Sequence, residues 1–175
     1  EGWWLVNFER APFRRETVSL IEYRQAWPAQ TAYSAALPVQ PNGVIGGRAV
    51  WIAVPDAPQA IEHFSSMGLS ASQACECPSL GGVAHELPVA PGQSLMVLEA
   101  ASAGPARDFI ETRGGAGVFG VTLRVAAAAP MTERAAALGL ATDWHDGLFG
   151  KTLTVPAAHA MGLHLEFALA ADADR

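Results

Sequence analysis

Residues 48–69 read RAVWIAVPDAPQAIEHFSSMGL, and residues 119–140 read FGVTLRVAAAAPMTERAAALGL. An offset of 71 positions, which matches Val50 with Val121, superimposes the two stretches without a gap. Each copy opens on alternating apolar residues, the pattern of a half-buried strand, and continues with apolar residues at helical spacing. The sequence is therefore predicted to contain one strand-helix unit twice.

Three further strands are expected after each helix. They are predicted over 70–77, 82–89 and 93–100 in the first copy and over 141–146, 150–156 and 162–169 in the second. Each unit is then β-α-β-β-β, and one unit alone exposes a sheet face that it cannot cover. We therefore predict an α+β fold in which paired βαβββ modules form a curved mixed sheet around a cleft.

The repeat also predicts the domain organisation. One domain is expected over 48–169, with its modules at 48–100 and 118–169. Between them, 105–115 is expected to form a connecting helix, since Pro105 suits a first helical position and two glycines end the segment.

The first 46 residues follow a different pattern. Residues 1–24 are predicted to be a β-hairpin, and 25–46 a proline-rich linker. SLIEY at 19–23 resembles GLHLE at 162–166, so we expect the hairpin to be the remnant of an upstream module that begins before Glu1. Its edge strand would then need a partner, either the missing upstream segment or a second copy of the chain in a homodimer.

Composition excludes several classes of protein. The net charge is −6 and the 11 basic residues form no stripe, which argues against nucleic acid as a partner. No run of about 18 apolar residues predicts a membrane span. Cys75 and Cys77 are expected to be reduced thiols, so a cytoplasmic protein is predicted. The chain opens at Glu1 without a signal-type apolar core, and we expect it to be a piece cut from a longer protein.

Several segments resemble the glyoxalase/bleomycin-resistance/dioxygenase superfamily, also called the vicinal oxygen chelate superfamily. They are the VPD turn at 54–56, the helix end at 64–69 and the closing strands at 95–99 and 163–167. The resemblance implies a glyoxalase-like enzyme of the lyase or isomerase type, acting on a small carbonyl or oxygenated metabolite. The alternative is a non-catalytic protein that binds and sequesters a small molecule, and the sequence leaves open whether the chain is an enzyme.

Metal-dependent members of that superfamily are similar in placing one ligand on the opening strand and one on the closing strand of each module. The matching positions here are Ala49, Met96, Gly120 and Glu166, so only Glu166 is a ligand type. A catalytic divalent ion needs about three protein ligands. No cofactor is therefore predicted within this chain. A divalent metal is expected only if the upstream module supplies ligands, with Glu22 as the equivalent residue of the hairpin joining Glu166.

Two residues are candidates for catalysis. Glu166 and His164 lie two apart on a predicted strand and so face the same side, where they could act as a general acid/base pair. A polar contact between strands is the alternative. Arg124 and Thr122 share the face of Gly120, and Arg124 could hold a substrate carboxylate unless it forms a surface ion pair.

Three more residues are candidates for contact with a ligand. Trp51 is in phase with Ala49 and could stack on a flat ligand, although core packing is the more common role of a strand Trp. Met96 would add to an apolar pocket. His85 lies beside Glu86 in mid-strand, so only one of these two side chains can face the cleft.

Overall fold

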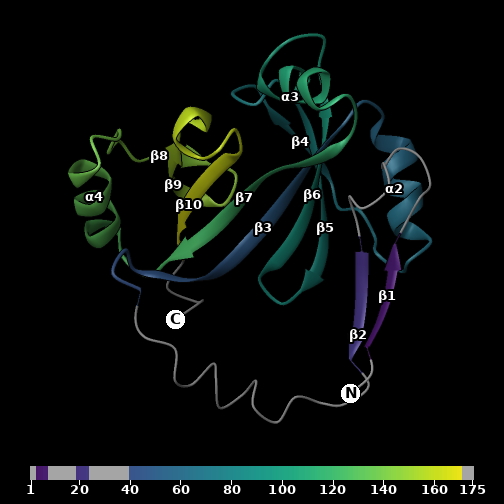
Figure 1. The fold of residues 1–175 in the computed structure, drawn as a ribbon, viewed down its shortest axis with the longest axis horizontal. Helices are drawn as coiled ribbons and strands as arrows, with labels where there is room; N and C mark the ends of the chain where they lie inside the picture. The colour runs from purple at the N-terminus through teal and green to yellow at the C-terminus, as the bar shows by residue number, and fades with distance from the viewer. Residues whose placement is uncertain (1–2, 8–18, 24–39, 171–175) are drawn as a thin grey trace.

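The computed structural model of the 175-residue chain describes residues 3–7, 19–23 and 40–170 (Figure 1). In chain order its elements are β1 (Trp3–Asn7), β2 (Ser19–Tyr23), β3 (Val44–Val54), α2 (Ala57–Ser65), β4 (Ala74–Cys77), β5 (Gly82–Ala90), β6 (Gln93–Ala100), α3 (Pro105–Arg113), β7 (Gly117–Val125), α4 (Ala128–Ala137), β8 (His145–Gly147), β9 (Gly150–Val155), the 3-10 helix η1 (Ala157–His159) and β10 (His164–Leu169). Within these described ranges, no helix is long and apolar enough to cross a membrane.

Eight of the strands form one mixed sheet in the order β4-β5-β6-β3-β7-β10-β9-β8. The opening strands β3 and β7 pair antiparallel at its centre, and each runs parallel to the closing strand of its own module, β6 or β10. In Figure 1 the sheet curves between α2 on one side and α4 on the other. The predicted α+β fold of paired βαβββ modules around a curved mixed sheet is confirmed.

Some elements differ in length from those predicted. The strands after the two module helices begin later than predicted: β4 starts at Ala74 rather than at 70, and β8 at His145 rather than at 141. The opening strand β3 instead begins early, at Val44, within the segment expected to be linker. It reaches that far because its first residues still pair with β7, through register shifts on either side of Gly46 and Gly47. The connecting helix α3 begins at Pro105 as predicted but ends at Arg113, before the predicted end at 115, because Gly114 adopts a left-handed conformation that closes it.

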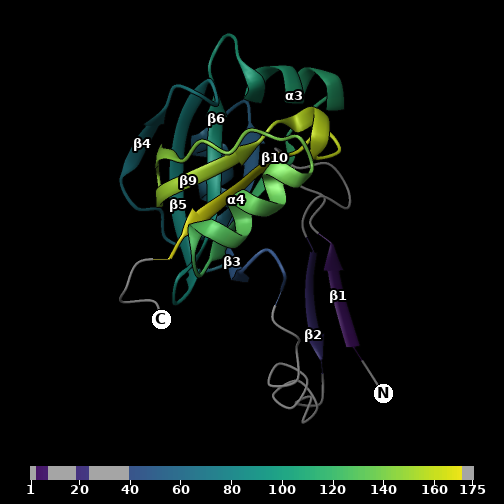
Figure 2. The ribbon, with the colours of Figure 1, turned by 90° about the vertical axis from the view of Figure 1, so that its left-hand side faces the viewer.

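The module helices cover the outer face of the sheet. Phe64 of α2 is buried with Ile52 and Val97, and Met131 of α4 is buried with Phe167. Figure 2 looks onto α4, with β9 and β10 behind it. Each helix therefore closes the outer side of its own module and leaves the inner, concave side free to form a site.

One end of the inner face is covered by α3. Ala106 and Ile110 of this helix are buried against Trp51, Leu98 and Phe119 from three central strands. This inner cluster fixes the position of Trp51, which is 1% exposed.

The hairpin β1–β2 is a separate two-stranded antiparallel sheet in which Trp4 lies opposite Glu22. Both predicted strands are present. The turn between them and most of the predicted linker lie outside the described residues. That the hairpin belongs to an upstream module stays a prediction.

Gly120 lies where β7 packs most closely against β10. Its neighbours across the sheet are Trp51 and His164. A Cβ at Gly120 would clash with the carbonyl oxygen of His164 and lie 2.7 Å from its Cβ. The present pairing of β7 with β10 therefore requires glycine here.

Replacing Gly120 by alanine tests this close contact. We expect Gly120→Ala to lower the free energy of unfolding by about 2 kcal/mol or more, because the new methyl group overpacks a buried site. Gly47→Ala is the matched control, since a Cβ at Gly47 meets nothing within 4 Å. That variant should stay within about 0.5 kcal/mol of the parent. Urea unfolding measures both, and equal stabilities would contradict the close contact.

Candidate active site

A pocket of about 740 Å³ opens beside α3, between that helix and the strands β9 and β10. Its apolar sides include Leu80, Phe109, Phe119 and Val155. The exposed polar side chains on its lining are Asp108, Arg113 and His145, among others. Two buried polar residues of β10, His164 and Glu166, complete it. A pocket of this size suits a small-molecule ligand.

Glu166 is held by a chain of hydrogen bonds that crosses the central strands. Its Oε2 accepts from Thr122 Oγ1 at 2.8 Å, and Thr122 Oγ1 accepts from Trp51 Nε1 at 2.8 Å. The register of β7 with β10 places Thr122 directly beside Glu166. Trp51 and Thr122 are 71 residues apart and so occupy the same position in their two modules.

His164 lies on the same face of β10. Its Nε2 is 3.6 Å from Glu166 Oε1, which is too long for a hydrogen bond but is an ion-pair distance when the imidazole is protonated. The ring stacks on Phe119, with centroids 5.4 Å apart and planes at 12°, and meets the edge of Trp51 at 5.8 Å. These aromatic contacts fix the orientation of the imidazole.

The surroundings of Glu166 keep it ionised. Burial, the largest single influence, raises its pKa. The nearby imidazole of His164, then the hydrogen bond from Thr122 and the charge of His145, outweigh burial and hold the pKa of Glu166 below its ordinary value. Glu166 is therefore a carboxylate at neutral pH, in a site largely shielded from water.

The two cysteines are free thiols. Burial, together with the nearby Cys75 and Glu166, raises the pKa of the Cys77 thiol to about 11. Cys77 is therefore protonated at neutral pH and is a poor nucleophile.

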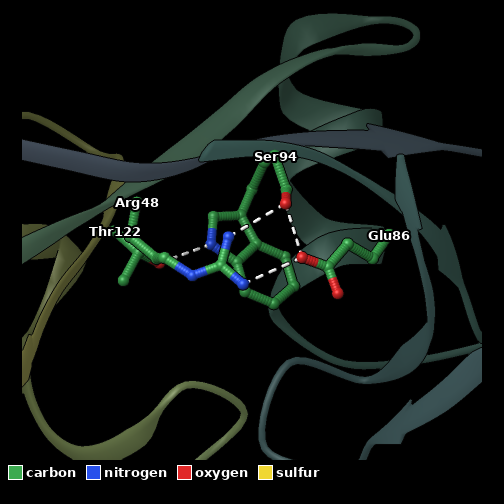
Figure 3. A network of polar contacts seen from close by, with 5 residues as sticks. Arg48, Glu86, Ser94 and Thr122 are labelled. Atoms are coloured by element: carbon green, nitrogen blue, oxygen red, sulfur yellow. Dashed lines mark hydrogen bonds and ion pairs between the residues drawn. The ribbon is translucent and has the colours of Figure 1, made fainter. Parts of the chain in front are cut away.

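A second polar cluster lies on strands of the first module. Arg48 donates from Nη1 to Ser94 Oγ and from Nη2 to Glu86 Oε1, each at 2.9 Å, and Ser94 Oγ donates to the same carboxylate oxygen at 2.5 Å (Figure 3). The Arg48 guanidinium also lies 4.0 Å over the ring of Phe149. Burial raises the pKa of Glu86, but the bonds from Ser94 and Arg48 lower it below its ordinary value. Arg48, Ser94 and Glu86 are thus bonded to one another.

The structure brings together only some of the predicted site residues. Glu166 and His164 reach the pocket, while Thr122 and Trp51 support Glu166 from behind. Met96 is fully buried in the inner cluster and does not line the pocket.

Two further candidates lie elsewhere. His85 is paired with Val97, whose side chain belongs to the cluster under α2, so His85 is on the outer face and Glu86 on the inner one. The Arg124 guanidinium lies beside Gly92, where a Cβ would be 3.1 Å from Nη1, and is not on the pocket lining. The side chain of Glu22 lies outside the described residues.

Other residues of the site were not predicted. Phe109 and Phe119, which line the pocket, meet edge-to-face with centroids 5.5 Å apart. Phe149 packs against both Arg48 and Trp51, although it follows β8 in the second module. Strand periodicity could have predicted which face of β7 carries Phe119. A contact made by a turn residue such as Phe149 leaves no periodic pattern in the sequence.

Within the described residues, the donors around Glu166 do not fit a divalent metal. Of the four superfamily positions, Ala49, Met96 and Gly120 offer no ligand atom, and a side chain at Gly120 is sterically excluded. In the described part of the chain, no three His, Cys, Asp or Glu side chains gather around one point.

The lowered pKa of Glu166 predicts how stability depends on pH. Such a carboxylate contributes stability that is complete above the unfolded glutamate pKa of about 4.3 and is lost as pH falls through the lower folded-state pKa. On acidification from pH 6 toward about pH 3, the parent should therefore lose more unfolding free energy than Glu166→Gln, which has no carboxylate at this position to protonate. Urea unfolding across this range measures it, and a constant difference would show that Glu166 is not held as a carboxylate.

The comparisons with known proteins find the fold but no sequence family. No protein-family model matches the chain, and no curated protein matches it significantly. A methylmalonyl-CoA epimerase from Mycobacterium tuberculosis is similar in structure, with a TM-score of 0.67 and 20% identity over 81% of this chain and 97% of that one.

Two more solved structures have a similar fold. A variant of the Streptomyces coelicolor methylmalonyl-CoA epimerase in complex with 2-nitronate-propionyl-CoA has a TM-score of 0.61 and 16% identity, over 74% of this chain and 96% of that one. The hypothetical protein BH1468 from Bacillus halodurans C-125 has a TM-score of 0.61 and 20% identity, over 72% and 94%. The epimerases belong to the glyoxalase superfamily. The chain therefore has the fold of the glyoxalase/bleomycin-resistance/dioxygenase superfamily, as its repeated segments predicted.

Proposed function

We propose that the chain is an isomerase-type enzyme that removes and returns a proton on a carbon next to a carbonyl group of a small molecule. The observation that carries the proposal is the buried, ionised carboxylate of Glu166 on the lining of a 740 Å³ pocket. A carboxylate is a common general base, and a water-shielded pocket favours such proton transfers.

In the proposed reaction, Glu166 accepts the proton of the carbon. The electron pair of the broken C–H bond moves toward the carbonyl oxygen and forms an enolate. Return of the proton by Glu166 to the same face restores the substrate, whereas return to the opposite face, after the planar enolate has turned in the pocket, gives the isomer. In both cases the carbonyl and the carboxylate are restored, so that atoms and charge balance. His164, whose Nε2 lies 3.6 Å from Glu166, stabilises the carboxylate before the transfer and after the return.

The substrate class is proposed from the neighbours and the pocket. One of the similar epimerase structures holds methylmalonyl-CoA and NH4+. Methylmalonyl-CoA is a thioester with an acidic proton on the carbon next to its carbonyl group. Arg113 on the pocket lining, which also carries Asp108 and Glu166, offers one guanidinium that could bind a negatively charged group of such a substrate. A carbonyl compound with a negatively charged group is thus the proposed class.

A non-catalytic, sequestering role is the second candidate. It is favoured by the residues at the superfamily ligand positions, where Ala49 and Met96 are buried and apolar and Gly120 has no side chain. Such a protein would need the pocket but not Glu166.

Isotope exchange separates the two. The protein is incubated in D2O with methylmalonyl-CoA and a panel of 2-substituted carbonyl compounds, and deuterium incorporation is followed by mass spectrometry. We expect exchange with at least one compound, and a loss of roughly 100-fold or more in Glu166→Gln, which lacks the base. Glu62→Gln, on the exposed side of α2, is the matched control and should exchange like the parent.

The opposite results are equally clear. Compounds that bind tightly and never exchange would favour sequestration. Exchange that survives in Glu166→Gln at the parent rate would remove Glu166 from the reaction.

A further inference from the structure

The hydrogen-bond chain to Glu166 has a fixed direction. An indole N–H can only donate, so Trp51 Nε1 must donate to Thr122 Oγ1. The hydroxyl of Thr122 has a single hydrogen, and its other close partner is Glu166 Oε2 at 2.8 Å. Thr122 is fully buried and Trp51 is 1% exposed, so water cannot replace either partner. The hydroxyl hydrogen therefore points at Glu166.

We propose that Trp51 and Thr122 are positioning residues that hold Glu166 Oε2 as a hydrogen-bond acceptor and leave Oε1 as the oxygen that takes the proton of the substrate. The inference rests on the proposed function. Oε1 has no hydrogen bond within the described structure, and its nearest polar partner is His164 Nε2 at 3.6 Å. It is the oxygen free to accept a proton.

The internal repeat explains why this arrangement is one-sided. Met96 lies beside Trp51 in the first module as Glu166 lies beside Thr122 in the second. The first module has no carboxylate at this position. Its Trp51 instead donates across the central strands, so that both modules contribute to one base.

The role as positioning residues predicts an order of effects on turnover. Thr122→Val keeps the volume but removes the hydroxyl, and should lower kcat roughly tenfold or more, because it removes a hydrogen bond to a charged group. Thr122→Ser keeps the hydroxyl and should stay within about threefold of the parent. Trp51→Phe should lower kcat less than Thr122→Val. Combining Trp51→Phe with Thr122→Val should add little, because Trp51 acts through Thr122.

A pH profile distinguishes positioning from a merely structural role. The bond from Thr122 lowers the pKa of Glu166, so Thr122→Val should raise that pKa and move the acid limb of the rate profile to higher pH. The titratable groups that act on or respond to Glu166 are His164, His145 and Cys77, and all three are unchanged in every variant. Thr122→Ser should keep the profile of the parent.

The decisive experiment titrates Glu166 in the ligand-free protein by 13C NMR of labelled glutamate carboxyls, with Glu166→Gln identifying the resonance. We expect Glu166 to titrate at higher pH in Thr122→Val than in the parent or Thr122→Ser. An identical titration in all three would overturn the inference, even if Glu166→Gln abolishes exchange. If the titration shifts as expected but no compound exchanges, the hydrogen-bond device stands and the proposed reaction fails. If Thr122→Val does not fold, Trp51→Phe is titrated instead, and an unchanged Glu166 would contradict the role of Trp51.

Discussion

The antiparallel pairing of β3 with β7 is the constraint on which the site depends. It joins the modules at the centre of the sheet and places the equivalent residues Trp51 and Thr122 within hydrogen-bond distance. The parallel pairing of β7 with β10 then puts Glu166 beside Thr122. A slip of one residue in either pairing would turn the alternating side chains to the opposite face and take the carboxylate out of the pocket.

The two halves of the inner face differ although their backbones repeat. In the first module, Glu86 is engaged by Arg48 and Ser94, and Phe149 lies over Arg48. In the second, Glu166 faces a pocket. The two modules thus share a backbone frame, and their different inner-face residues engage Glu86 in the first module and leave Glu166 on a pocket lining in the second.

The internal repeat was sufficient to predict the two modules. Strand alternation was sufficient to predict that Glu166 and His164 lie on the same face of one strand. Strand alternation depends only on chain geometry, and for that reason it also indicated that His85 and Glu86 face opposite sides. Strand alternation predicts the face of the sheet on which a side chain lies, but not its position along the strand relative to the pocket. Arg124 shares the face of Thr122, yet lies toward Gly92 rather than the pocket. Nor does it reveal contacts made by turns, such as that of Phe149 with Trp51. The cytoplasmic location and the pairing of the hairpin with an upstream segment or a second copy stay predictions.

We propose Glu166 as the base of a site formed jointly by both modules. A crystal structure with a nitronate analogue of an acyl thioester, of the kind bound by the Streptomyces coelicolor epimerase variant, tests it most directly. We predict that the nitronate carbon lies about 3–3.5 Å from Glu166 Oε1, with Oε2 still bonded to Thr122. An analogue bound away from Glu166, or a carboxylate turned away from Thr122, would contradict it.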